Sequence, residues 1–152
     1  MRDNSDIYSQ HIASQIYEGL LKFNSEDLSI EPCIAKSYEV DSLNSVFIFK
    51  LRDDVFFHNA SCFNNGKGRK LEGADVVYSF ENIYTKEATN RAYTNFTNTV
   101  VGGEEFYNGT ATEISGISVD GNKVTIQILE PSSVFIQKLA TVFATIVPYE
   151  SF

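Results

Sequence analysis

The chain has 152 residues, of which 43% are hydrophobic and 13% aromatic, so its composition is that of a globular protein with one core. Its formal charge of -8 argues against a nucleic-acid partner, because affinity for phosphate backbones depends on clustered Lys and Arg. One short basic cluster, formed by Lys67, Arg69 and Lys70, is interpreted as a solvated loop.

No stretch of the sequence approaches the ~20 apolar residues that a membrane span needs. Polar residues follow Met1, where a signal peptide would have its apolar core. We therefore expect the sequence as given to be soluble and to lack an export signal. Cys33 and Cys62 permit one disulfide without requiring it, which leaves the redox compartment open.

Residues 6 to 22 carry apolar side chains at helical spacing, which predicts an amphipathic leading helix over this range. Residues 35 to 51 then form two extended runs around the turn-rich residues 41 to 45, which predicts a β-hairpin. The apolar stripe of the leading helix consists of Tyr8, Ile12, Ala13, Ile16, Tyr17 and Leu20.

Residues 59 to 70 are rich in Asn, Gly, Ser and Lys, which predicts a surface loop. A second helix follows, with Asp75 in its first turn, where a carboxylate interacts favourably with the helix dipole. The polar stretch from 88 to 112, with scattered aromatic residues, predicts one or two short helices. The stripe of the second helix, predicted to lie in the core, consists of Val76, Val77, Phe80, Ile83 and Tyr84.

Residues 113 to 119 and 123 to 129 flank an Asp-Gly-Asn turn at 120 to 122, which predicts a second β-hairpin. Ser132 or Ser133 is then expected to cap a short helix. The elements together predict an α+β fold, in which antiparallel strand pairs form one small sheet and helices flank a face of it.

The residues expected of an active site are missing or wrongly spaced. His11 and His58 have no Cys or His at metal-ligand spacing, so we expect no zinc site. Cys62 lies near His58, but a catalytic cysteine also needs an oxyanion-stabilising helix start and a third, orienting group. The adjacent carboxylates at 53–54 and 104–105 are sent apart on a strand or loop. We therefore expect no enzyme activity, no metal and no cofactor.

Five short stretches of the sequence carry a resemblance: Ile16 to Leu21, Pro32 to Val40, Phe47 to His58, Ala74 to Glu81 and Val124 to Pro148. Each stretch alone is weak, but five in sequence are specific, and together they span nearly the whole chain. In this order and with these intervals, the chain resembles the family 5 extracellular solute-binding proteins, the oligopeptide- and dipeptide-binding components of ABC importers.

The chain departs from the family in two ways. Relatives usually carry a Thr that caps the second helix, whereas here Glu72 and Gly73 precede Ala74, which predicts a weakened helix start. Relatives are also several times longer, with two lobes that close over the ligand. The resemblance implies a leading helix at 6–22 and, at 30–150, the smaller N-terminal lobe of a class II-type periplasmic binding protein, with the remainder of that protein absent.

The resemblance implies a substrate-binding subunit of an ABC importer, which captures peptides between two lobes for delivery to the permease. In the family that the chain resembles, the peptide lies as an extended strand held largely through its backbone, with water in the spare volume. By position, Ser5, Asp6, Ile7 and Tyr8 match a stretch that lines the peptide, and Tyr93 matches an aromatic residue that faces the cleft. The alternatives are ordinary surface for Ser5 and Asp6, and core packing for the other three.

The implied partners are a short peptide or other small solute and the ABC permease subunits, without nucleic acid. The resemblance also implies a monomer in the periplasm or cell envelope, which contacts the membrane through a lipid anchor in the full-length protein. Two alternatives remain open: a stand-alone, receptor-like interaction module, and the same importer role for a nickel chelate, haem or sugar. A hydrolase built on Cys62 ranks third.

Overall fold

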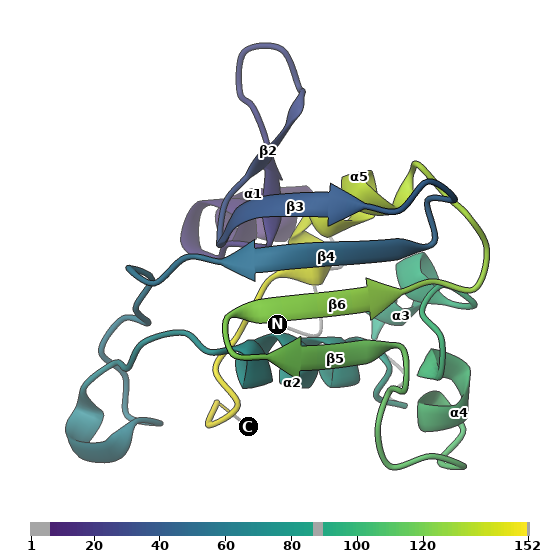
Figure 1. The fold of residues 1–152 in the computed structure, drawn as a ribbon. Helices are drawn as coiled ribbons and strands as arrows, with labels where there is room; N and C mark the ends of the chain where they lie inside the picture. The colour runs from purple at the N-terminus through teal and green to yellow at the C-terminus, as the bar shows by residue number, and fades with distance from the viewer. Residues whose placement is uncertain (1–6, 87–89, 152) are drawn as a thin grey trace.

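The computed structural model describes residues 7–86 and 90–151, with side chains described from residue 11 onwards (Figure 1). Its main sheet contains β3 (Ala35–Val40), β4 (Val46–Leu51), β5 (Ile117–Asp120) and β6 (Lys123–Gln127). These strands are antiparallel and lie in the order β3-β4-β6-β5. Both predicted hairpins and the α+β fold are confirmed.

The two hairpins join through β4 and β6. Phe47 lies opposite Ile126, and Phe49 lies opposite Val124. Because residues alternate between the two sides of a strand, these four side chains share one face of the sheet. All four are at most 1% exposed. Helices cover this face, whereas the other face of the sheet is open (Figure 1).

Helix α2 (Gly73–Ile83) and helix α5 (Phe135–Leu139) pack on the covered face with the short helix η2 (Val142–Ala144). The predicted stripe of α2 is confirmed for Val76, Phe80, Ile83 and Tyr84, which are buried, while Val77 is half-buried. Aromatic rings connect the layers: the ring centroids of Phe47 and Phe135 lie 4.8 Å apart, and those of Phe80 and Phe96 lie 6.0 Å apart.

Three further helices of the described chain are short: η1 (Asn64–Gly66) in the predicted surface loop, α3 (Arg91–Phe96) and α4 (Gly103–Tyr107). The last two lie in the described part of the stretch from 88 to 112, as predicted. None of the described helices is long and apolar enough to cross a membrane.

Helix α1 (Ile7–Ile16) ends well before residue 22, so the predicted bounds of 6–22 are wrong at the C-terminal side. Gly19 instead pairs with Thr145, and β1 (Leu21–Phe23) pairs with β2 (Ile30–Pro32). These hydrogen bonds with distant segments override the local helical preference of residues 17 to 22.

The predicted apolar stripe of α1 is also wrong in part. Ala13 is buried, but Ile12 and Ile16 are 61% and 59% exposed. Leu20 and Leu21, which are neighbours on the extended segment, are each 1% exposed. The helical spacing therefore does not predict burial here. Leu20 is buried although it lies beyond the helix, and Ile12 and Ile16 are exposed although they lie within it.

The start of α2 is stabilised by Asp75, a residue of its own first turn. The backbone N–H of Glu72 donates to Oδ2 of Asp75 at 2.8 Å. This bond satisfies a donor at the helix start, so the predicted weakening at Glu72 and Gly73 is wrong. The expected serine cap of α5 is wrong too, because the residue at its N-cap is Val134.

The hydroxyl of Tyr84 holds α3 and the strand-like segment after it against α2. It donates to the carbonyl of Phe96 at 2.6 Å and accepts the N–H of Val100 at 3.1 Å. Tyr84 is fully buried, and burial raises the pKa of its hydroxyl. Gly103 lies so close that a Cβ atom there would be 2.5 Å from the Tyr84 ring.

Replacing Tyr84 by Phe is expected to lower the free energy of unfolding by about 1–3 kcal/mol, because two buried backbone groups lose their partner. Urea denaturation followed by circular dichroism measures this change. Tyr38, which is half-buried on β3, supplies the matched control: Tyr38→Phe should change the free energy by less than about 0.5 kcal/mol. Equal losses for the two variants would contradict the assignment.

Candidate functional site

The predicted ligand-facing residues of the N-terminal segment fall at the edge of the described chain. Ser5 and Asp6 lie outside the described residues, and Ile7 and Tyr8 form the start of α1. Helix α1 packs against η2, as does α3, which carries Tyr93. The elements that carry the predicted residues therefore meet at the same short segment, on the covered side of the sheet.

Tyr93 of α3 is half-buried between α4 and the C-terminal end of α2. Its ring stacks on Tyr107 with centroids 3.8 Å apart and planes 4° apart, and it meets the edge of Tyr84 at 6.0 Å. Its hydroxyl donates to Oε2 of Glu104 at 2.7 Å. These contacts fix the side chain within the lobe, and its predicted role towards a ligand stays a prediction.

An apolar groove lies beside the end of α1. We define it by three groups of residues: Ile16 and Tyr17 of the α1 end, the segment from Val55 to Phe63, and the segment from Ile146 to Ser151. Its volume is about 500 Å³, and Phe56 on its rim is 62% exposed. The sequence did not indicate this groove, because its helical spacing assigned Ile16 and Tyr17 to the apolar stripe of the leading helix.

Arg69 lies at the border of this groove. The interpretation of the basic cluster as a solvated loop is wrong for this residue, because its side chain is bonded to two carboxylates. Two of its nitrogens lie 2.8 and 2.6 Å from the carboxylate oxygens of Asp75. Two bonds of 2.7 Å join it to the carboxylate of Glu150. Its guanidinium also lies 4.2 Å from the ring centroid of Tyr149 and 5.4 Å from that of Phe57.

Arg69 forms ion pairs with both Asp75 and Glu150. The Asp75 side chain is fully buried, and a buried carboxylate is costly unless it is paired and hydrogen-bonded. The Arg69 guanidinium lowers the pKa of Glu150, and both carboxylates raise the pKa of Arg69. Lys67 and Lys70 are exposed, so the solvated reading is confirmed for them.

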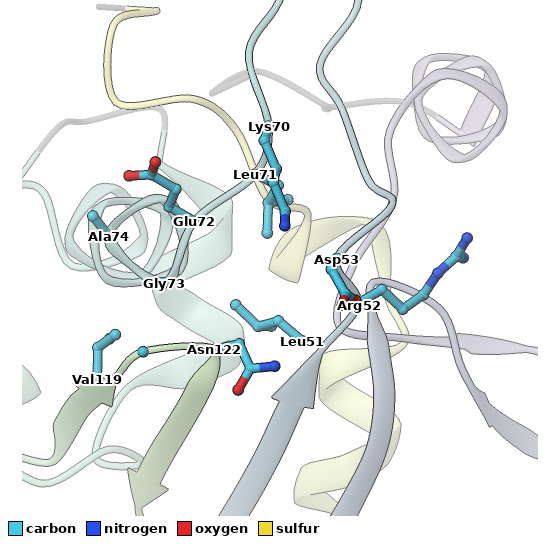
Figure 2. A pocket seen from close by; sticks show the side chains of 11 residues that line it. Leu51, Arg52, Asp53, Lys70, Leu71, Glu72, Gly73, Ala74, Val119 and Asn122 are labelled. Atoms are coloured by element: carbon cyan, nitrogen blue, oxygen red, sulfur yellow. The ribbon is translucent and has the colours of Figure 1, made fainter.

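A second hollow, of about 530 Å³, opens between the end of β4, the β5–β6 turn and the start of α2 (Figure 2). Leu51 and Leu71 provide apolar side chains there, and Lys70 extends towards Leu51. Arg52 points away from the hollow and instead pairs with Asp54 at 2.9 Å in solvent. Charges of both signs line this hollow, so it has no clear preference for an anion or a cation.

The described residues contain no group of three or more His, Cys, Asp or Glu side chains that could hold a metal ion. Cys33 and Cys62 are free thiols in the structure, and burial raises the pKa of Cys33. Asp53 and Asp54 have different surroundings, one lining the second hollow and the other pairing with Arg52.

Residues 29–151 match the family described as bacterial extracellular solute-binding proteins, family 5 Middle. The chain belongs to this family. It is 26% identical over 148 residues to the peptide transport periplasmic protein SapA of Salmonella typhimurium, covering 97% of this chain and 26% of that protein. It is 30% identical over 139 residues to the dipeptide-binding protein of Escherichia coli, covering 89% and 24%.

Solved structures of this family share the fold. A periplasmic oligopeptide-binding protein from Borrelia burgdorferi superposes with a TM-score of 0.80 at 24% identity, covering 97% of this chain and 28% of that one. DppA from Helicobacter pylori, solved in complex with a peptide, gives 0.77 at 22% identity with the same coverage. The predicted family and fold are confirmed, and this family 5 chain spans about a quarter of the length of its relatives.

Acid should weaken the contact between Arg69 and Glu150. The folded-state pKa of Glu150 is depressed, so its contribution to stability is present above the unfolded value of about 4.3 and is lost as the pH falls through the folded value. We expect the difference in unfolding free energy between the wild type and Glu150→Gln to be constant near pH 7 and to shrink below about pH 4.3. Urea titrations at pH 7, 5, 4 and 3 measure it, and a pH-independent difference would contradict the role of the charge.

Proposed function

We propose that this family 5 protein is the substrate-binding component of an ABC importer, which captures short peptides and delivers them to a permease. The observation that carries this proposal is the family match over residues 29–151. Relatives that cover nearly the whole chain are named for peptide transport and dipeptide binding.

In this proposal, the described lobe supplies one wall of a cleft and a second lobe of the complete protein supplies the other. An extended peptide binds between them through backbone hydrogen bonds, so that its side chains can vary. In the same proposal, Ser5, Asp6, Ile7 and Tyr8 contact the peptide, and Tyr93 of α3 faces the cleft. The complete protein works as a monomer in the periplasm or cell envelope, held to the membrane by a lipid anchor.

One relative is named for another ligand class, and one structure of the same fold is a receptor. A stretch of 69 residues is 33% identical to heme-binding protein A of Haemophilus influenzae, covering 45% of this chain and 12% of that protein. The pheromone receptor PrgZ shares the fold with a TM-score of 0.79 at 16% identity. A ligand test must therefore include haem beside peptides.

Isothermal titration of the complete protein with trialanine, tetra-alanine and haemin tests the proposal. We expect the peptides to bind with a Kd of about 1 μM or tighter, which corresponds to about -8 kcal/mol, and haemin to give no saturable heat. Saturable binding of haemin without peptide binding would contradict the peptide as the ligand and indicate a porphyrin instead. No heat with any peptide or with haemin would refute solute capture of these classes.

Variants of the complete protein test the predicted contact residues. Tyr8→Ala is expected to weaken peptide binding about tenfold, a loss of about 1.4 kcal/mol. Leu43→Ala is the control, because Leu43 is 67% exposed in the turn between β3 and β4, and its affinity should match the wild type. Unchanged affinity of Tyr8→Ala would contradict the proposed contact between the start of α1 and the peptide.

A further inference from the structure

Two segments that are far apart in sequence form facing walls of the apolar groove. The first wall, residues 55 to 58, is bound to the chain around Arg69: the N–H of Phe57 donates to the carbonyl of Arg69 at 2.9 Å, and the N–H of Leu71 donates to the carbonyl of Val55 at 3.0 Å. The second wall is the strap, by which we mean residues 146 to 151.

The strap is held to α2 by side chains. The N–H of Val147 donates to the hydroxyl oxygen of Ser79 at 2.9 Å. The N–H of Tyr149 donates to Oδ1 of Asp75 at 3.2 Å, and the same Oδ1 lies 2.6 Å from Arg69. The backbone of the strap therefore shares its acceptor on α2 with the guanidinium.

Arg69 contacts both walls at once. Its guanidinium lies over Phe57 of the first wall and over Tyr149 of the strap, and it forms two bonds with Glu150. A guanidinium can do this because its planar fork bonds two carboxylates in its plane while its faces contact aromatic rings. The compact ammonium of a lysine has neither the fork nor the flat faces.

We propose that Arg69 is the positioning residue of the apolar groove, which holds the strap against the first wall and so controls how often the groove opens. Local opening of a segment depends on the few contacts that hold it, and is separate from unfolding of the whole domain. Three contacts of the strap pass through Arg69: the bonds to Glu150, the stacking on Tyr149, and the orientation of Asp75 towards the N–H of Tyr149. This inference concerns the groove itself and does not depend on the ligand of the proposed importer.

Amide hydrogen exchange, measured residue by residue by NMR on the 152-residue chain, tests this inference. The principal variant is Arg69→Met combined with Asp75→Asn, which removes the cation without leaving a buried carboxylate unpaired. We expect exchange at Val147 and Tyr149 to be at least tenfold faster than in the wild type, with β4 and β6 unchanged. Arg69→Lys should give an intermediate rate, and the uptake of the neutral dye Nile red should rise several-fold in the double variant.

A second variant and a control keep the test decisive. Glu150→Gln removes one contact from a partly exposed side chain, so it tests the same inference with less risk to folding, and exchange at Tyr149 should rise several-fold. Arg52→Met removes another arginine that pairs with a carboxylate in solvent, and the strap should exchange as in the wild type. Equal acceleration of the strap and of β4 and β6, or unchanged strap exchange in both test variants, would overturn the proposal.

Discussion

The pairing of β4 with β6 is the contact on which the rest of the structure depends. Each hairpin alone exposes a row of apolar side chains, and joining them places Phe47, Phe49, Val124 and Ile126 on one continuous face. Helices α2 and α5 and the rings of Phe96 and Phe135 are buried against that face. The same pairing brings the β5–β6 turn beside the start of α2, where Gly73 must lack a side chain because Val119 packs against it.

A single buried carboxylate then organises the border of the groove. Asp75 bonds the N–H of Glu72 at the start of α2, and its burial requires a cation, which Arg69 supplies. Arg69 in turn bonds Glu150 and contacts Tyr149 and so fixes the strap. The carboxylate that caps α2 is therefore also connected to the strap, a wall of the groove that lies more than seventy residues further along the chain.

The two sides of the lobe differ in their chemistry, and this difference bears on the proposed function. On the open face of the sheet, Lys50 lies opposite Lys123, and both are exposed. At α1 and the groove, Ile12, Ile16 and Phe56 are each more than half exposed, while the more exposed Leu28 and Leu43 lie in turns after β1 and β3. The helical side also carries the start of α1 and Tyr93, so the proposed function assigns the solute to this side.

The sequence by itself determined the two hairpins, helix α2 with its buried stripe, and the family. The hairpins and the helix depend on neighbours within about ten residues, such as the Asp-Gly turn at 120 and 121 and the helical spacing of Val76 and Phe80. The family follows from the order of five such local stretches along the chain. Only the tertiary structure decided that α1 ends at Ile16, that Arg69 leaves solvent, and that Tyr93 stacks on Tyr107. Each of these features depends on contacts with residues from other elements. Local spacing in the sequence does not predict which of those residues will come into contact.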